Sequence, residues 1–258
     1  FIVKYNLNGQ IKLEEHIDGS EFSFIIPLNN DFTGGGTKFK YIESKIVTDP
    51  GNVIVFCGKH KHKGIEILKL MILRLKRLKK LNPIIVATSY NKEDKKIIKF
   101  CKTNKIVYFV GSEKNVLSRF YLAAKKFKLN KIIRLTSDCP LIDTKIIDKL
   151  INIYNKNKYD FVSNSVPPPS KFPDGSDVEI FSFNALERAF KNSKLASEKE
   201  HVTFYIWKSK LFKTFKLKNK NDYSKVRYSL DYMGDYNLIT NIINYFGKRI
   251  YSCNTNQI

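Results

Sequence analysis

The feature that most constrains this chain is a change of pattern at Gly64. From there on, segments with helical periodicity alternate with short apolar runs of strand length. The helical patterns lie at about 65–80, 92–103, 113–127, 145–156, 183–192, 198–208 and 236–245, and the strand patterns at 83–88, 106–110, 131–135, 160–163, 178–181 and 226–230. Repeated strand–helix units predict an α/β fold, a parallel sheet with helices on both faces.

Residues 1–63 have a different pattern, made of short strand-like runs separated by turns. The strand-like runs lie at 1–5, 22–28, 38–41 and 53–56, and the turns at Asn8-Gly9, Gly34-Gly35-Gly36 and Asp49-Pro50-Gly51. No helix of normal length fits this segment. The pattern predicts a partial antiparallel β segment, so we expect two domains, at 1–63 and 64–258.

The net charge of +22 raises the question of a nucleic-acid partner. The excess is nearly all lysine, scattered among many Asn and Ile residues, and its densest run, at 74–80, interleaves leucines at helical spacing. That spacing is typical of the solvated face of an amphipathic helix. We therefore do not expect a nucleic-acid partner.

The four cysteines, Cys57, Cys101, Cys139 and Cys253, contain no C-x-x-C pair, which favours a reduced, cytoplasmic protein. The apolar runs are too short for a membrane span, and no signal peptide is visible. Because the chain begins at Phe1 without a methionine, we expect a fragment. Its oligomeric state stays open, with a homodimer as one option.

Two aspartates stand where predicted strands end. Asp138 follows the strand pattern at 131–135, and Asp231 closes the pattern at 226–230. Ligands of open α/β sheets bind beyond the carboxyl ends of the strands, and Mg²⁺ prefers one or two carboxylates plus phosphate oxygens. The two residues could therefore hold a metal that bridges a nucleotide triphosphate. The alternative is that each is an ordinary cap or turn residue.

A set of short segments points to one family. They are IIVATS at 84–89, GSE at 111–113, VLSRFY at 116–121, RLTSDCPLI at 134–142, DFVSN at 160–164, FPDGSDVE at 172–179, EKEHVT at 198–203 and RYSLD at 227–231. In their order and approximate spacing, residues 64–258 resemble the cytidylyltransferases that act in spore-coat polysaccharide synthesis and sugar-acid activation. The resemblance implies a Rossmann-like nucleotidyltransferase fold, with CTP and a sugar or sugar acid as its substrates.

The resemblance also implies roles for individual residues. Asp138 and Asp231 would be the catalytic Mg²⁺ ligands, and Thr88 and Arg119 would lie near the nucleotide. Asp174, Glu200 and His201 would lie near the sugar. For His201, a purely structural role is an equal alternative, because one histidine on a helix needs no function.

One part of the family pattern is missing. The family begins with a strand and a loop rich in Gly, Ser, Arg and Lys that wraps the triphosphate, and nothing upstream of Ile65 resembles it. Such loops supply the backbone N–H groups and basic side chains that hold phosphates. Its absence leaves turnover by this chain alone in question.

The segment 1–63 contains a second candidate site. An H-x-D pair, His16 and Asp18, is followed at a distance by His60 and His62, a spacing that suits the facial triad of non-haem iron enzymes. With HID at 16–18, FSF at 22–24, GGGTKF at 34–39 and GNVIVF at 51–56, the segment resembles part of the prolyl- and lysyl-hydroxylase type of 2-oxoglutarate dioxygenase.

By that resemblance His16, Asp18 and His62 would bind Fe(II), with His60 as the substitute for His62. The family's basic residue for 2-oxoglutarate would fall at about position 72, which is Ile72.

Both resemblances stop near Gly64, so we expect a truncated or recombined gene product, with a chimera completed by another subunit as the alternative. The first functional hypothesis is a CTP-dependent nucleotidyltransferase of surface polysaccharide or glycan biosynthesis, impaired if the missing loop is indispensable. The second is an Fe(II)/2-oxoglutarate hydroxylase in the first segment. The third is a non-catalytic fusion of two incomplete domains.

Overall fold

The computed structural model describes residues 23–25, 54–56, 63–78 and 80–258. Backbone contacts divide the chain into two units, Phe1–Lys63 and Gly64–Ile258. In the first unit, strand β1 (Ser23–Ile25) pairs antiparallel with β2 (Ile54–Phe56). This pair agrees with the antiparallel pattern predicted at 22–28 and 53–56. The other two predicted strands, at 1–5 and 38–41, lie outside the described residues.

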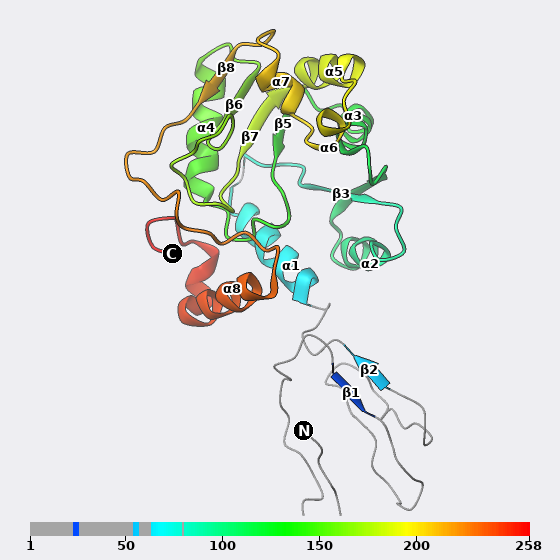
Figure 1. Ribbon diagram of the computed structural model, residues 1–258, viewed down its shortest axis with the longest axis vertical. Coiled ribbons are helices and arrows are strands. Elements are labelled where there is room, and N and C mark those ends of the chain that lie inside the picture. Colours follow the sequence, from blue (N-terminus) through cyan, green and yellow to red (C-terminus); the bar gives the residue numbers. More distant parts are fainter. Residues whose placement is uncertain (1–22, 26–53, 57–62, 79) are drawn as a thin grey trace, which may run out of the picture. The chain divides into compact units, whose positions relative to one another are not determined.

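The remaining elements alternate between strand and helix over most of their length (Figure 1). The strands are β3 (Ile85–Ser89), β4 (Val107–Gly111), β5 (Lys131–Arg134), β6 (Phe161–Ser163), β7 (Glu179–Ser182) and β8 (Thr214–Lys216). The helices are α1 (Lys63–Leu75), α2 (Lys95–Thr103), α3 (Val116–Lys126), α4 (Thr144–Lys156), α5 (Phe183–Asn192), α6 (Ala196–Glu200), α7 (Phe204–Lys208) and α8 (Met233–Phe246), followed by the 3₁₀ helix η1 (Gly247–Tyr251).

The strands form a mixed sheet system. β3 and β4 pair in parallel, and the other four strands are ordered β5-β7-β6-β8, with β6 and β8 parallel. β7 runs antiparallel to both β5 and β6, so the predicted parallel sheet contains one antiparallel strand. The reason is the connection, because β7 follows β6 through a loop without a crossover helix, and only parallel neighbours need such a crossover.

Helices cover both faces of this four-stranded sheet, as predicted (Figure 1). Alternate residues of a strand point to opposite faces. Val162 and Ile180 accordingly belong to one core cluster with Ile147 and Leu150 of α4. Their neighbours Phe161 and Phe181 belong to a second cluster, with Leu117 of α3, Leu186 of α5 and Ile206 of α7. The sheet is therefore the middle layer of a three-layer α/β unit.

Local capping signals set where several helices begin. The side chain of Asn115 accepts a hydrogen bond from the Ser118 N–H at 2.9 Å and starts α3. Asp143 starts α4 in the same way, and Ser182 starts α5. Each side chain satisfies one of the N–H groups that have no partner within the first helical turn.

Three predicted elements differ in the structure. The helix expected at 198–208 is two short helices, α6 and α7, separated near Val202, whose φ of 40° interrupts helical geometry. The strand expected at 226–230 makes only an isolated bridge, between Arg227 and Asp174. β8 was not predicted, because its sequence, Thr-Phe-Lys, contains a single apolar residue.

One buried arginine joins segments that are far apart in the sequence. The Arg74 side chain, fully buried on α1, donates hydrogen bonds to the carbonyls of Leu141 at 3.2 Å, Ile142 at 2.9 Å and Cys253 at 2.8 Å, and also to Ile250. Burial lowers the pKa of Arg74. The guanidinium thus ties α1 to the loop after Asp138 and to the segment after α8.

None of the helices among the described residues has the length and apolar character needed to cross a membrane.

Candidate functional site

Three loops meet at one end of the four-stranded sheet. Arg134 ends β5 and Glu179 begins the antiparallel β7, and the two residues are paired across the strands. The loop after β5 and the loop before β7 therefore emerge at the same end of the sheet. The third loop, at 226–232, comes just before α8.

Backbone hydrogen bonds connect these three loops. The Leu230 N–H donates to the Asp138 carbonyl at 2.7 Å, which brings the Asp231 segment against the Asp138 segment. The Asp174 N–H donates to the Val226 carbonyl at 3.0 Å, and the Tyr228 N–H donates to the Asp174 carbonyl at 3.0 Å. Asp138, Asp174 and Asp231, which were predicted from separate motifs, are thus brought together.

Gly175 permits the close approach of two of these loops. Its φ is +96°, in the region that favours glycine, and an added Cβ would lie 2.5 Å from the Ser229 backbone nitrogen. Any larger residue would push the 173–177 loop away from the segment that carries Asp231.

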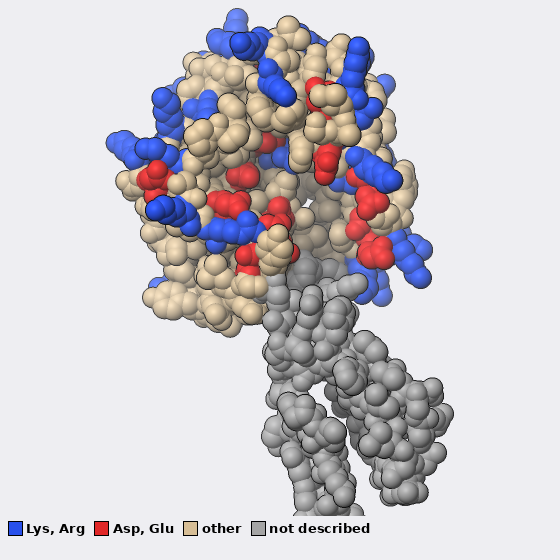
Figure 2. All heavy atoms as spheres, in the orientation of Figure 1, with Lys and Arg blue, Asp and Glu red and all other residues tan. Residues whose placement is uncertain are grey.

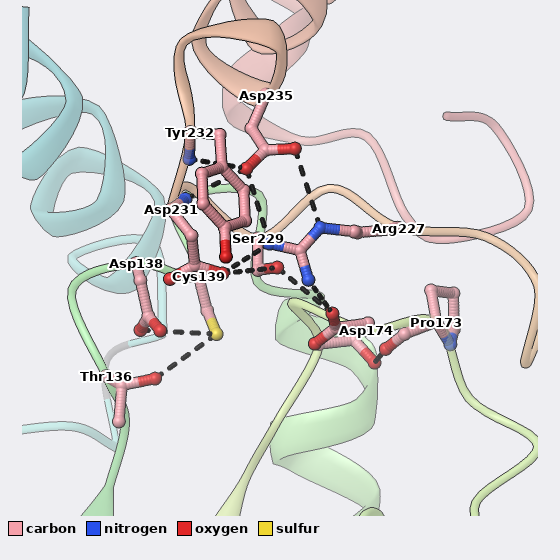
Figure 3. Close-up of polar contacts among 11 residues, drawn as sticks. Thr136, Asp138, Cys139, Pro173, Asp174, Arg227, Ser229, Asp231, Tyr232 and Asp235 are labelled. Atoms are coloured by element: carbon pink, nitrogen blue, oxygen red, sulfur yellow. Dashed lines mark hydrogen bonds and ion pairs between the residues drawn. The ribbon is translucent and has the colours of Figure 1, made fainter.

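Arg227 lies among the acidic side chains of the site (Figure 3). Its Nη1 donates to Asp174 Oδ2 at 2.7 Å, and its Nη2 donates to Asp231 Oδ2 and to Asp235 Oδ2, the latter at 3.3 Å. Hydrogen bonds to Asp235 and Asp231 raise the pKa of Arg227. The hydrogen bond from Arg227 and those from the Tyr232 and Asp231 N–H groups lower the pKa of Asp235 to about 2. Sequence reasoning gave Arg227 and Asp235 no role.

The surface around the site carries both signs of charge. Figure 2 shows acidic side chains gathered across the middle of the face that it displays, with lysines and arginines mostly around its margin. On this face, the described residues do not form one continuous basic surface.

Asp138 and Asp231 lie on segments joined by a backbone hydrogen bond, and their carboxylates are of the kind that Mg²⁺ takes as ligands. The described residues contain no group of three or more His, Cys, Asp or Glu side chains that could hold a metal ion. Two carboxylates still fit Mg²⁺, because this ion commonly takes one or two carboxylates and completes its shell with phosphate oxygens and water. The pair is thus suited to a metal that arrives with a nucleotide.

Cys139, beside Asp138, stays a neutral thiol. Its Sγ lies 3.2 Å from Thr136 Oγ1 and donates to Asp138 Oδ1 at 3.7 Å. Burial, together with the nearby Asp138 charge, raises the pKa of Cys139 to about 12. The thiol is therefore a small, buried and uncharged neighbour of Asp138, and it is not a thiolate ligand for a metal.

Asp177 is a further carboxylate of the FPDGSDVE loop. Burial raises its pKa to about 6, and the negative charges of Glu179, Asp174 and Asp138 act in the same direction, against a hydrogen bond from Ser165. Near neutral pH this group can change its protonation state. Within this loop, only Asp174 was predicted to have a role.

Glu179 connects two of the sequence motifs. Its Oε2 pairs with Arg134 Nη1 at 3.0 Å and accepts a hydrogen bond from Thr203 Oγ1 at 3.1 Å. Glu179 and Thr203 are both buried, so this network is internal. The EKEHVT segment thereby reaches the site through Thr203.

Glu200 and His201, predicted near the sugar, are exposed at the end of α6. The His201 ring lies 6.4 Å from the Phe204 ring, measured between centroids. Their role at the sugar stays a prediction.

The predicted nucleotide residue Thr88 lies at the carboxyl end of β3. Its hydroxyl donates to Asp94 Oδ2 at 2.8 Å, and the same oxygen accepts bonds from the Ser89 N–H at 2.8 Å and the Ser89 hydroxyl at 2.7 Å. Burial opposes ionisation of Asp94, but these hydrogen bonds lower its pKa overall. Asp94 therefore fixes the conformation of the turn after β3.

Arg119, the other predicted nucleotide residue, lies close to Gly111 at the end of β4. An added Cβ on Gly111 would lie 2.9 Å from Arg119 Cγ, so glycine leaves room for this side chain. Arg119 Nη1 donates to the Ser112 carbonyl at 3.0 Å, and the charge of Asp94 is near enough to act on Arg119. Thr88 and Arg119 thus belong to one neighbourhood, at the ends of β3 and β4.

The iron ligands predicted in the first unit, His16, Asp18 and His62 with His60 as substitute, lie outside the described residues. They stay predictions, as does the use of 2-oxoglutarate.

Comparisons with known proteins give the family. A family model described as cytidylyltransferase matches residues 62–241, which is more than half of the chain. The protein MJ1063 of Methanocaldococcus jannaschii is 40% identical over 184 residues, covering 70% of this chain and 73% of the relative. The spore coat polysaccharide biosynthesis protein SpsF of Bacillus subtilis is 27% identical over 164 residues, covering 61% of this chain and 63% of the relative.

Among solved structures, a cytidylyltransferase from Leptospira borgpetersenii superposes with a TM-score of 0.67 at 34% identity, covering 73% of this chain and 79% of that chain. The matched region contains the three loops and the ends of β3 and β4 described above. The chain therefore belongs to the cytidylyltransferase family.

Proposed function

We propose that the chain transfers CMP from CTP to a hydroxyl group of a sugar or sugar acid, in the synthesis of a surface polysaccharide or another glycan. Family membership supports the nucleotidyl transfer. Similarity to a protein named for spore coat polysaccharide biosynthesis supports the class of product. The catalytic body in this proposal is residues 64–258.

The observation that carries the proposal is the 2.7 Å hydrogen bond from the Leu230 N–H to the Asp138 carbonyl. This bond brings together two aspartates from distant motifs, both at the end of the sheet where α/β enzymes bind their ligands. Asp138 and Asp231 are the residues that would hold Mg²⁺. When bound, the metal supplies positive charge to the phosphate oxygens.

In the proposed reaction, the sugar hydroxyl oxygen forms a bond to the α-phosphorus of CTP. The bond from that phosphorus to the bridging oxygen of the β-phosphate breaks, pyrophosphate leaves with the electron pair, and the hydroxyl proton passes to water. Positioning of the two reactants supplies much of the catalysis in such transfers.

The remaining predicted residues are assigned to the two substrates. Thr88 and Arg119, at the ends of β3 and β4, are proposed to lie beside the nucleotide. Asp174, Glu200 and His201 are proposed to lie on the sugar side. Asp174 is the best supported of these three, because its loop is bonded to the segment that carries Asp231.

The test is the melting temperature of the full chain with CTP and Mg²⁺, compared with ATP, with GTP, and with CTP in EDTA. A ligand that binds only the folded state stabilises it by about 2.7 kcal/mol at a hundred times its dissociation constant. We expect a rise that requires both CTP and Mg²⁺. Equal shifts with all three nucleotides, or none, would contradict the proposal.

A further inference from the structure

Arg227 is shared between the proposed metal ligand Asp231 and Asp174 of the FPDGSDVE loop. Its two terminal nitrogens have different partners. Nη1 donates a hydrogen bond to Asp174, and Nη2 donates to Asp231 and Asp235. Both bonds within the site end on Oδ2 of the aspartates. Ser229 Oγ lies within hydrogen-bond distance of the same two oxygens, 3.1 Å from Asp174 Oδ2 and 3.4 Å from Asp231 Oδ2. In Figure 3, Asp138 lies on the side of Asp231 that faces away from Arg227.

We propose that Arg227 is a positioning residue for the metal site, which fixes one oxygen of Asp231 and leaves the other oxygen for a metal shared with Asp138. This inference rests on the proposed function, because it assumes that Asp138 and Asp231 hold the metal. By the same contacts, Arg227 links the position of Asp231 to that of Asp174. Carboxylates that bind metals are commonly oriented by such outer hydrogen bonds.

The shape of the guanidinium is what suits it to this role. Arginine presents its N–H groups in a rigid plane, so two carboxylates bound to it are held at a fixed separation. A lysine ammonium at the same place is a point charge that can neutralise the aspartates without fixing their geometry. Arginine and lysine at position 227 should therefore differ in metal binding more than their equal charge suggests.

The contribution of Arg227 is geometric more than stabilising. The side chains of Arg227, Asp174 and Asp231 are 39%, 49% and 45% exposed. The two ion pairs with this exposure add little to the free energy of unfolding, so stabilisation by Arg227 comes from its third pair, with Asp235, whose side chain is 15% exposed. Metal affinity, and not the melting temperature, is therefore the quantity that reports this role.

Simple electrostatics predicts the opposite result for the same mutation. Removing a cation beside Asp231 makes the site more negative, and a divalent cation should then bind more tightly. If Arg227 positions Asp231, its removal frees the carboxylate to rotate, and the cation should bind more weakly. The sign of the change separates the two explanations.

The experiment titrates Mn²⁺ into the full chain in the presence of CTP and follows free Mn²⁺ by electron paramagnetic resonance, with CTP alone as the blank. For Arg227→Met we expect the dissociation constant to rise about tenfold to a hundredfold. For Arg227→Lys we expect an intermediate rise. Arg77→Met, which removes the same charge from an exposed arginine just after α1, is the matched control and should bind Mn²⁺ like the wild type.

A second comparison tests the link through Arg227. Asp174→Asn should weaken Mn²⁺ binding in the wild-type background and add less in the Arg227→Met background, because Arg227 carries part of the effect of Asp174 on Asp231. Ser229 Oγ, which is within reach of Oδ2 of both aspartates, carries the remainder. Such non-additivity is the mark of residues that act through one network. Additive effects of the two substitutions on Mn²⁺ binding would contradict a link from Asp174 to Asp231 through Arg227.

The outcomes also separate this inference from the proposed function. A wild type that binds Mn²⁺, with unchanged or tighter binding by Arg227→Met, overturns the positioning role alone. A wild type that binds no Mn²⁺ beyond the amount bound by CTP alone overturns the metal site itself, and the positioning role with it. If Arg227→Met does not fold, Arg227→Lys carries the same test, and binding by the lysine variant equal to that of the wild type overturns the positioning role.

Discussion

The Thr203 hydroxyl donates a hydrogen bond to the same Glu179 oxygen that pairs with Arg134. Through this oxygen the EKEHVT segment, the FPDGSDVE loop and the end of β5 become one unit. Thr203 is 1% exposed and Glu179 4% exposed, so the network is shielded from water. Polar groups in such surroundings are costly to leave without partners.

Thr203→Val should lower the free energy of unfolding by about 1.5–3 kcal/mol, the usual value of a hydrogen bond to a charged group. Urea denaturation measures this, with Thr214→Val as control, because Thr214 is exposed on β8. Equal losses in the two variants would show that the valine itself is responsible.

Glu179→Gln should destabilise the protein more, by about 3–5 kcal/mol, because it leaves the mostly buried Arg134 charge without its partner. The same urea denaturation measures this loss. A loss no larger than that of Thr203→Val would mean that water reaches Arg134.

Gly175→Ala tests the close approach of the two loops. An alanine there meets both the positive φ and the 2.5 Å contact with the Ser229 nitrogen, so we expect a loss of more than about 1 kcal/mol in unfolding free energy. Gly234→Ala on α8 is the control, because its added Cβ would meet nothing within 4 Å. Because Gly234 lies in the first turn of α8 and not in its middle, we expect this exchange to change the free energy of unfolding little. Thermal unfolding measures both variants, and a loss for Gly175→Ala no larger than that for Gly234→Ala would contradict the close approach.

Much of the α/β unit follows from sequence periodicity, and what was missed depends on contacts distant in the sequence. The alternation of elements and the strand-end position of Asp138 needed only local patterns. The break between α6 and α7 did not, because it accompanies the contact of Thr203 with Glu179, which lies 24 residues away. β8 also lacks a local signal, since its place beside β6 is set by the sheet.

Arg227 shows why part of the site could not be predicted. Arg227, Asp231 and Asp235 are spaced at four-residue intervals, which on a helix would be an ordinary surface charge pattern. Here Arg227 and Asp231 precede α8 and lie in an extended segment and a turn. The same four-residue spacing therefore places these side chains together in the site. Only the conformation of the loop distinguishes this arrangement from a charge pattern on the surface of a helix.

Asp138→Asn and Asp231→Asn should each abolish the Mg²⁺-dependent part of the stabilisation by CTP. Each amide keeps the size of the side chain but removes the negative charge that the cation needs. Differential scanning fluorimetry with CTP, in Mg²⁺ and in EDTA, measures the loss. Asp148→Asn removes a carboxylate that pairs with Lys80 on the surface, and it should keep the full shift. A shift retained by both site variants would contradict the metal assignment.

The raised pKa of Asp177 predicts a pH-dependent stability. Its folded pKa of about 6 exceeds its ordinary value of 3.8, so the stability that its protonated form contributes is complete below about pH 3.8 and is lost as the pH rises through 6. Asp177→Asn cannot ionise and should therefore be more stable than the wild type at pH 8, but not at pH 4. Urea denaturation in EDTA at both pH values measures this. If the free energies of unfolding of the variant and the wild type differ by the same amount at pH 4 and pH 8, ionisation of Asp177 is not the cause of the difference.

The carbonyl groups around Arg74 have a consequence for the order of assembly. The guanidinium lies on α1, but its acceptors follow 67 to 179 residues later in the chain. Until the segment up to Cys253 has been synthesised, Arg74 has only some of its hydrogen-bond acceptors. A guanidinium without all of its acceptors is more stable exposed to water than buried. α1 can form earlier, but the hydrogen bonds of Arg74 are complete only after residues 250–253 have emerged. Native packing around this arginine is therefore completed late, by the last of its acceptor segments to be made.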